Sequence, residues 1–85
     1  MVDLVSGAQM RAARGVLKWT VAELERRSGV SSMTLKRMEG ADGVPRARIE
    51  NIQAVHDAFI ASGRVRFEGE SGLFFQRGDE DTASG

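Results

Sequence analysis

Side chains that commonly carry out catalysis are sparse in this sequence. The chain has 85 residues, no cysteine and one histidine, His56. The lack of cysteine excludes thiolate nucleophiles and disulfides, and one histidine falls short of the several ligands that a metal site needs. His56 lies in a stretch with helical spacing, and no pattern around it indicates a Ser-His-Asp triad. We therefore expect no enzymatic activity, no metal or other cofactor and no small-molecule ligand. His56 is expected to be packed and hydrogen-bonded, or to lie at a dimer interface.

The charged side chains are unevenly distributed along the chain. The formal net charge is zero, but residues 1–66 hold eleven Lys and Arg against seven Asp and Glu. Residues 67–85 hold one against five. This asymmetry indicates that the basic part binds nucleic acid. The acidic run at residues 79–81 is interpreted as a solubilising tail, with a DNA-mimicking tail that weakens binding as the alternative.

Length and composition define the broad class of the protein. A chain this short is expected to form one domain, and its modest core favours self-association. No apolar run approaches the roughly 20 residues of a membrane span, and the N-terminus lacks the features of a signal peptide. The absence of cysteine fits the cytoplasm. We therefore expect no membrane partner and a cytoplasmic location, in a bacterial nucleoid-associated pool.

Helical spacing of apolar residues predicts four helices, over residues 7–18, 21–28, 31–40 and 45–61. The first two begin with the capping-box spacings Ser6-x-x-Gln9 and Thr20-x-x-Glu23, in which side chains satisfy free backbone donors. Pro45 suits the first position of the fourth helix, where its missing N–H costs nothing. The apolar stripe of that helix is predicted to contain Ile49, Ile52, His56 and Phe59.

Two short alternating segments, residues 64–67 and 73–76, flank a glycine-containing loop and predict a β-hairpin. Phe67, Phe74 and Phe75 cannot all face one side, because side chains alternate along a strand. Either the hairpin packs on helix 45–61 and leaves an aromatic ring exposed, or the surplus ring meets a second chain. We favour the second arrangement, a homodimer formed by Val65, Phe67, Phe74 and Phe75.

The most informative segment is residues 20–40, which contains two short helices joined by a turn at Gly29. A sharp turn of this kind suits glycine, and the apolar Val30 and Leu35 are placed to lock the second helix against the first. The second helix then presents a polar, partly basic face that can enter the major groove of DNA. Ser31 at its start is expected to leave backbone N–H groups free for a phosphate.

Residues 19–40 resemble the core of the Cro/repressor-type (XRE-like) helix-turn-helix regulators of bacteria, phage and mobile elements. The similarity is closest at Ser28-Gly29-Val30-Ser31 and at residues 35–39. It extends over about residues 6–77, although only residues 20–40 are specific. Two positions depart from the family, which usually has a small Ala where this chain has Glu25 and often a Gln where it has Val21.

The resemblance implies a mainly α fold: a four- to five-helix Cro/repressor-like helix-turn-helix domain with a C-terminal β-hairpin or strand. The implied organisation is an N-terminal tail (1–5), a DNA-binding domain (6–61), a dimerisation hairpin (62–77) and an acidic disordered tail (78–85).

Site residues follow from the same resemblance. Those placed to contact bases are Ser32, Met33, Lys36 and Arg37. Those placed to contact the DNA backbone are Thr20, Arg26, Arg27, Ser31, Thr34, Arg46 and Arg48, with Arg11 and Arg14 as further candidates. Arg37 is the best candidate for direct readout, because a guanidinium can bind guanine O6 and N7 together.

The expected function is therefore that of a sequence-specific transcription regulator, a dimeric repressor or autoregulatory switch that binds a palindromic double-stranded DNA operator. Its two reading helices would lie about 34 Å apart, one turn of DNA. The alternative is a protein-interaction module, an antitoxin or anti-activator that keeps the helix-turn-helix fold without binding DNA. The zero net charge, Glu25 and Val21 favour this alternative.

Overall fold

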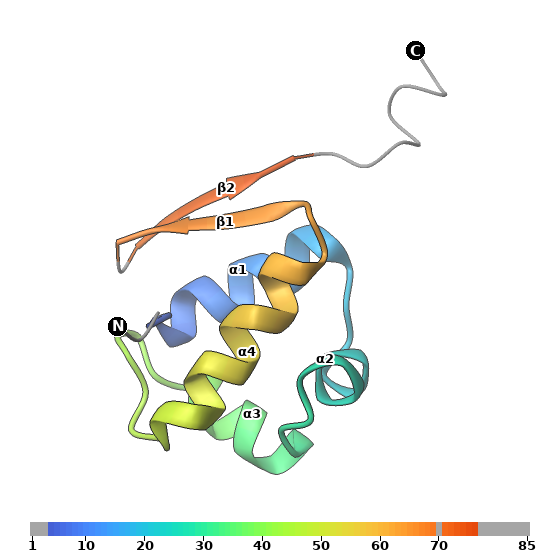
Figure 1. The fold of residues 1–85 in the computed structure, drawn as a ribbon. Helices are drawn as coiled ribbons and strands as arrows, with labels where there is room; N and C mark the ends of the chain where they lie inside the picture. The colour runs from blue at the N-terminus through green and yellow to red at the C-terminus, as the bar shows by residue number, and fades with distance from the viewer. Residues whose placement is uncertain (1–3, 70, 77–85) are drawn as a thin grey trace.

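The computed structural model describes residues 4–69 and 71–76. Four helices, α1 (Gly7–Leu17), α2 (Val21–Ser28), α3 (Ser32–Glu39) and α4 (Ile49–Ala61), precede two strands, β1 (Val65–Glu68) and β2 (Gly72–Phe75). The strands form an antiparallel hairpin across one side of the helices, and α3 lies on the opposite side (Figure 1). The expectation of a mainly helical chain with a C-terminal hairpin is confirmed. The predicted acidic tail, residues 78–85, lies outside the described residues.

Local signals at the helix ends explain where α1 and α2 begin. Ser6 Oγ accepts the Gln9 N–H at 3.0 Å, and Gln9 Oε1 accepts the Ser6 N–H at 3.0 Å, so the predicted capping box is present. Thr20 Oγ1 likewise accepts the Glu23 N–H at 3.0 Å. The second box is only half realised, because the Glu23 carboxylate pairs with arginines of its own helix instead.

The predicted start of the last helix is wrong, because α4 begins at Ile49 with Arg48 as its N-cap. Pro45 is buried in the preceding loop rather than placed in the first turn. The loop is fixed by tertiary contacts, since the Gly7 N–H donates to Gly43 O at 2.9 Å. Anchoring to α1 and burial of the proline therefore outweigh its local preference for a first helical turn.

The core lies between the helices and under the hairpin. Its fully buried side chains include Met10, Ala13, Leu24, Leu35, Met38, Ile52, Val55 and Phe59. Val5, grouped with the N-terminal tail in the sequence analysis, is also fully buried. Ile49 is 50% exposed, so the predicted apolar stripe of α4 was wrong at that residue. His56 is half-buried, packs its ring beside Phe67 and pairs with Asp57, which fits the packed alternative.

The register of the hairpin divides its aromatic rings between two faces. Val65 pairs with Phe75 and Phe67 with Leu73, and these pairs face the helices, whereas Arg66 and Phe74 pair on the outer face. Phe67 meets Phe59 edge to face, with ring centroids 5.9 Å apart. Phe74 remains 52% exposed. Phe75 is also exposed, at 36%, so the hairpin packs on its own chain and still leaves aromatic surface in solvent.

No helix in the described part of the chain combines the length and the apolar character needed to cross a bilayer.

Candidate nucleic-acid interface

Three residues connect α2 to α3, and each has a distinct role in the turn. Gly29 caps α2 with φ 78°, a left-handed conformation that favours glycine, and its N–H donates to Glu25 O at 2.8 Å. Val30 is buried with Leu35, as predicted. Ser31 caps α3 by accepting the Thr34 N–H at 3.3 Å. The turn therefore fixes α3 against α2 through short-range contacts, and the two helices run in different directions (Figure 1).

One face of α3 points into solvent. Leu35, Met38 and Glu39 face inward, so the outward face carries Met33, Lys36 and Arg37, which share it at spacings of three and four residues. Met33 is 81% exposed, which rules out a role for this side chain in the core. Lys36 and Arg37 have no ion-pair partner among residues 4–69 and 71–76. Three of the four residues assigned to base contact therefore lie together on an exposed and partly basic face.

Ser32, the fourth of these residues, is turned toward α2 and bound to Glu25. Its hydroxyl donates to Glu25 Oε1 at 2.7 Å, and its backbone N–H donates to Oε2 at 3.1 Å. Both bonds lower the pKa of Glu25, the hydroxyl bond most, against an opposing effect of desolvation. Glu25 thus places a carboxylate at the start of α3, where the helix dipole favours negative charge.

This carboxylate changes the expected role of the α3 N-terminus. Its backbone N–H groups were expected to be free for a phosphate, but those of Ser32 and Thr34 already donate within the protein. The Ser31 hydroxyl is also occupied, since it donates to Thr34 Oγ1 at 3.0 Å. The Thr34 hydroxyl acts as acceptor in that bond, so its own proton remains available to a phosphate oxygen.

The backbone-contact residues of α2 are partly neutralised. Glu23 accepts hydrogen bonds from both Arg26 and Arg27, and the bond from Arg27 is the largest cause of its lowered pKa. The Arg27 guanidinium also lies 4.4 Å from the Trp19 ring centroid. The structure therefore brings Thr20, Arg26 and Arg27 together around one residue, Glu23: Thr20 accepts its backbone N–H and the two arginines pair with its carboxylate. This surface carries less positive charge than the sequence suggested.

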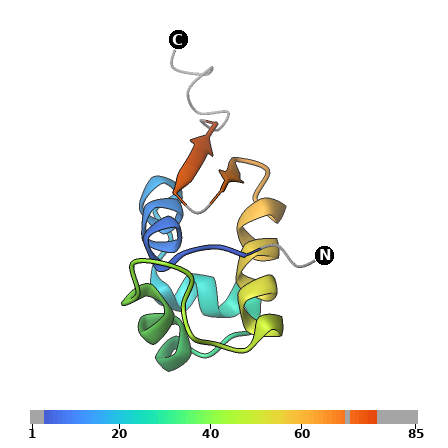
Figure 2. The ribbon, with the colours of Figure 1, turned by 90° about the vertical axis from the view of Figure 1, so that its left-hand side faces the viewer.

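The loop between α3 and α4 supplies two further cations. Arg46 and Arg48 are exposed, and the contact of Arg48 with Glu50 is long, at 3.9 Å. Arg46 has no ion-pair partner in the described ranges. Figures 1 and 2 both show this loop leaving the end of α3. α3 and the loop that follows it thus carry three cations, Lys36, Arg37 and Arg46, that no described carboxylate neutralises.

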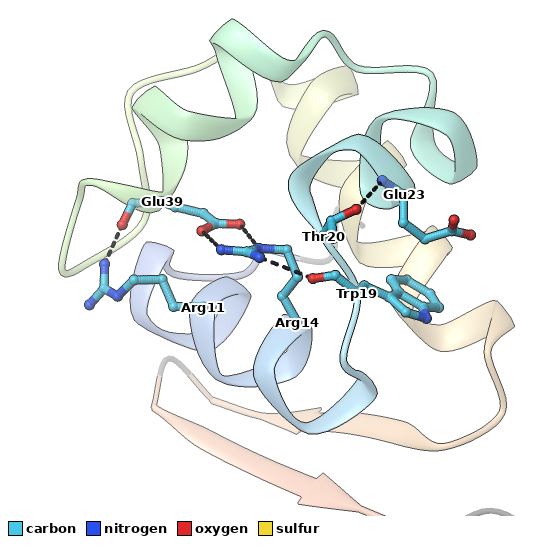
Figure 3. A network of polar contacts seen from close by, with 6 residues as sticks. All are labelled: Arg11, Arg14, Trp19, Thr20, Glu23 and Glu39. Atoms are coloured by element: carbon cyan, nitrogen blue, oxygen red, sulfur yellow. Dashed lines mark hydrogen bonds and ion pairs between the residues drawn. The ribbon is translucent and has the colours of Figure 1, made fainter.

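A clamp holds the end of α3 to α1, and the sequence analysis missed it (Figure 3). Glu39 is 7% exposed, and its carboxylate receives two hydrogen bonds from Arg14, Nε to Oε2 at 2.8 Å and Nη2 to Oε1 at 2.9 Å. Arg14 Nη1 also donates to Trp19 O at 3.0 Å, and Arg11 donates to Glu39 O. Arg11 and Arg14, expected as possible DNA contacts, are therefore engaged in positioning α3.

The residues assigned to a dimer interface differ in exposure. Val65 is buried and Phe67 half-buried against their own chain, whereas Phe74 and Phe75 are 52% and 36% exposed. Arg66 lies over the Phe74 ring and Arg64 over the Phe75 ring, at 4.8 and 5.1 Å from their centroids. Of these four residues, the two on β2 therefore carry the exposed aromatic rings.

No family model matches the chain, and no curated protein matches it either. Function must therefore be inferred from the arrangement of α2, α3 and the loop that follows α3.

Proposed function

We propose that this protein is a sequence-specific, double-stranded DNA-binding transcription regulator of the Cro/repressor-type helix-turn-helix class, acting as a dimer on a palindromic operator. The observation that carries the proposal is the outward face of α3, where Met33, Lys36 and Arg37 lie exposed and the two cations have no ion-pair partner among the described residues. The short turn at its start and the Arg14–Glu39 clamp at its end hold α3 against α2 and α1, which suits a helix that is presented to a major groove.

Each side chain of this face has a chemistry that suits DNA. A guanidinium such as that of Arg37 binds guanine O6 and N7 through two hydrogen bonds, and Met33 offers apolar contact to a thymine methyl group. Lys36 and Arg46 suit phosphates, which set affinity and register rather than sequence. Because phosphate contacts release counterions, the affinity of such a complex falls steeply with salt.

The test is fluorescence anisotropy with duplex DNA from upstream of the gene, beside a scrambled duplex. Specific binding should be at least about 10³-fold tighter than binding to the scrambled sequence. Arg37→Ala should weaken specific binding about tenfold or more and relax the base preference at one position, and Arg46→Ala should weaken both duplexes and reduce the salt slope by about one.

Lys18→Asn is the charge-matched control. Lys18 is an exposed C-cap of α1 with φ 59°, a conformation that Asn tolerates, and it belongs to the end of α1 rather than to α3. Its replacement should leave DNA binding within about twofold of the parent, because no phosphate contact is lost. An equal loss for Lys18→Asn and Arg37→Ala would mean that only net charge matters, which contradicts readout by α3.

A protein-interaction module is the second candidate function, favoured by the carboxylates of α2. Glu23 neutralises Arg26 and Arg27, and Glu25 sits at the start of α3. This candidate predicts no preferred duplex and a protein partner whose binding changes little with salt. Equal, weak binding to native, scrambled and pooled random duplexes would favour it over DNA recognition.

A further inference from the structure

The hydrogen bond between Glu25 and Ser32 fixes the polarity of a half-buried side chain at the start of α3, the helix proposed to enter the major groove. Glu25 belongs to α2 and Ser32 is the first residue of α3, so the contact spans the turn. The Ser32 hydroxyl lies 2.7 Å from Oε1 and its backbone N–H lies 3.1 Å from Oε2, so one carboxylate engages both groups. Both residues are half-buried.

The direction of this bond is dictated by chemistry. An ionised carboxylate has acceptors only, and a serine hydroxyl has one proton and two lone pairs. The lowered pKa of Glu25 keeps its carboxylate ionised at neutral pH. The Ser32 hydroxyl must therefore donate its only proton to Glu25, and what remains for an external partner is a lone pair.

We propose that Glu25 is a specificity-determining residue, which restricts Ser32 to accepting a hydrogen bond and so selects an amino group on the base that Ser32 meets. In the major groove such donors are adenine N6 and cytosine N4. Guanine offers O6 and N7 and thymine offers O4, all acceptors. The base facing Ser32 is therefore adenine or cytosine. This inference rests on the DNA-binding function proposed above and adds a rule for one operator position.

The same polarity excludes a phosphate from this end of α3. A phosphate offers only acceptors and carries negative charge, so it meets no donor at Ser32 and is repelled by Glu25. The Thr34 hydroxyl, two residues further on, retains its proton because it accepts from Ser31. Phosphate contacts near the start of α3 are thus assigned to Thr34 and not to Ser32.

The experiment is selection of binding sites from a pool of random duplexes by the full chain, followed by sequencing. It compares the parent with Ser32→Ala, Glu25→Gln and Glu68→Gln. Ser32→Ala removes the hydroxyl and keeps the backbone bond to Glu25. Glu25→Gln provides an amide that can donate to Ser32 Oγ and release its proton. Glu68→Gln changes the net charge equally at an exposed position of the hairpin.

The parent is expected to enrich adenine or cytosine over guanine and thymine by at least about fivefold at one position of each half-site. Ser32→Ala should lose this preference at that position only, and Glu25→Gln should admit guanine and thymine there. Glu68→Gln should reproduce the parent sequence. Because Ser32→Ala leaves the backbone contact with Glu25 in place, this variant tests the base preference even where Glu25→Gln impairs folding, as monitored by circular dichroism.

Two results would overturn the inference while leaving DNA binding intact. One is guanine or thymine in the parent at the position that Ser32→Ala alters, and the other is a selected sequence that Ser32→Ala leaves unchanged. A parent that enriches no sequence at all is a different result, because it removes the proposed function itself.

Discussion

Gln9 shows how one side chain can join elements that are distant in sequence. The residue is 2% exposed. Its amide accepts the Ser6 N–H through Oε1 and donates through Nε2 to Gly69 O at 2.9 Å and Gly72 O at 2.7 Å. The capping half of this role was visible in the sequence as a spacing of three residues. The bonds to the hairpin were not, since they join residues 60 and 63 positions apart.

Gln9→Glu is expected to destabilise the fold by about 2 kcal/mol at neutral pH. A carboxylate keeps the capping acceptor but sets an oxygen against two carbonyl oxygens, leaving them without their donor. The introduced carboxyl should have a pKa raised in the folded state, so the loss should shrink as the pH falls below that pKa and the group regains a proton to donate. Urea unfolding followed by circular dichroism at pH 7 and pH 4.5 measures both effects.

Gln76→Glu is the matched control, because it adds the same charge at an exposed position directly after β2. Its effect should stay within about 0.5 kcal/mol. Similar urea midpoints for the two variants would show that the Gln9 amide contributes nothing to holding the hairpin.

At the scale of elements, two glycines of the helical part have opposite effects on the stability of the fold. Gly15 lies inside α1, and a Cβ there would meet nothing within 4 Å. Gly29 also has open space around it, but its φ of 78° is left-handed. Glycine in a helix interior costs about 0.5–1 kcal/mol relative to alanine, whereas the left-handed conformation costs other residues about 1–2 kcal/mol.

Gly15→Ala should therefore stabilise the protein by about 0.5–1 kcal/mol, and Gly29→Ala should destabilise it by about 1–2 kcal/mol. In a small domain a change of 1 kcal/mol shifts Tm by about 4–8 °C. Thermal unfolding of both variants beside the parent tests the pair. A shift of both in the same direction would contradict the assignment of Gly29 as the residue that the turn requires.

The elements predicted well from sequence are those governed by local signals. Caps at Ser6, Thr20 and Ser31 and the stop at Gly29 place α1, α2 and α3 within a residue or two of their observed bounds. The start of α4 was wrong because tertiary contacts hold the loop around Pro45. Helix periodicity describes one element at a time, so it does not contain such contacts.

The candidate site likewise has features that local sequence signals predict and features that depend on long-range contacts. The exposed positions of α3 follow from its period, and Met33, Lys36 and Arg37 were identified correctly as its outward residues. The clamp between Arg14 and Glu39 joins residues 25 positions apart and leaves no spacing to recognise. The contact of Glu25 with Ser32 did have a signal in the sequence. Glu25 stands where the resemblance led us to expect a small residue, and it lies seven residues before Ser32, across the turn at Gly29.

The whole molecule has two opposed sides with different surfaces. The hairpin covers α1 and α4, and α3 lies on the far side of the helices (Figure 1). Figure 2 shows the same separation from a second direction. Two copies that read one DNA duplex must present both α3 helices on the same side. Packing the outer faces of two hairpins would instead place the α3 helices at opposite ends of a dimer.

Pairing between strand edges avoids this conflict. The sheet of the described residues has two strands, so one edge of β2 carries no strand. If β2 paired with β2 of a second copy across a two-fold axis, the result would be one continuous four-stranded sheet with both α3 helices beneath it. The exposed rings of Phe74 and Phe75 lie on this strand, which favours the β2 edge.

Removing one backbone donor tests this dimer. The Gln76 N–H donates to Arg64 O at 2.7 Å, so alternation along the antiparallel pair turns the N–H of Phe75 away from β1 and toward the open edge. Phe75→Pro deletes that N–H without removing a hydrogen bond of the hairpin. Phe75→Ala is the control, because it also removes the phenyl ring but keeps the backbone N–H. Light scattering after size exclusion should show dimers of two 9.2 kDa chains for the parent and for Phe75→Ala. Phe75→Pro should be monomeric, and it should bind a palindromic duplex more weakly than the parent. A monomeric parent, or equal dimerisation of the two variants, would contradict pairing through the β2 edge.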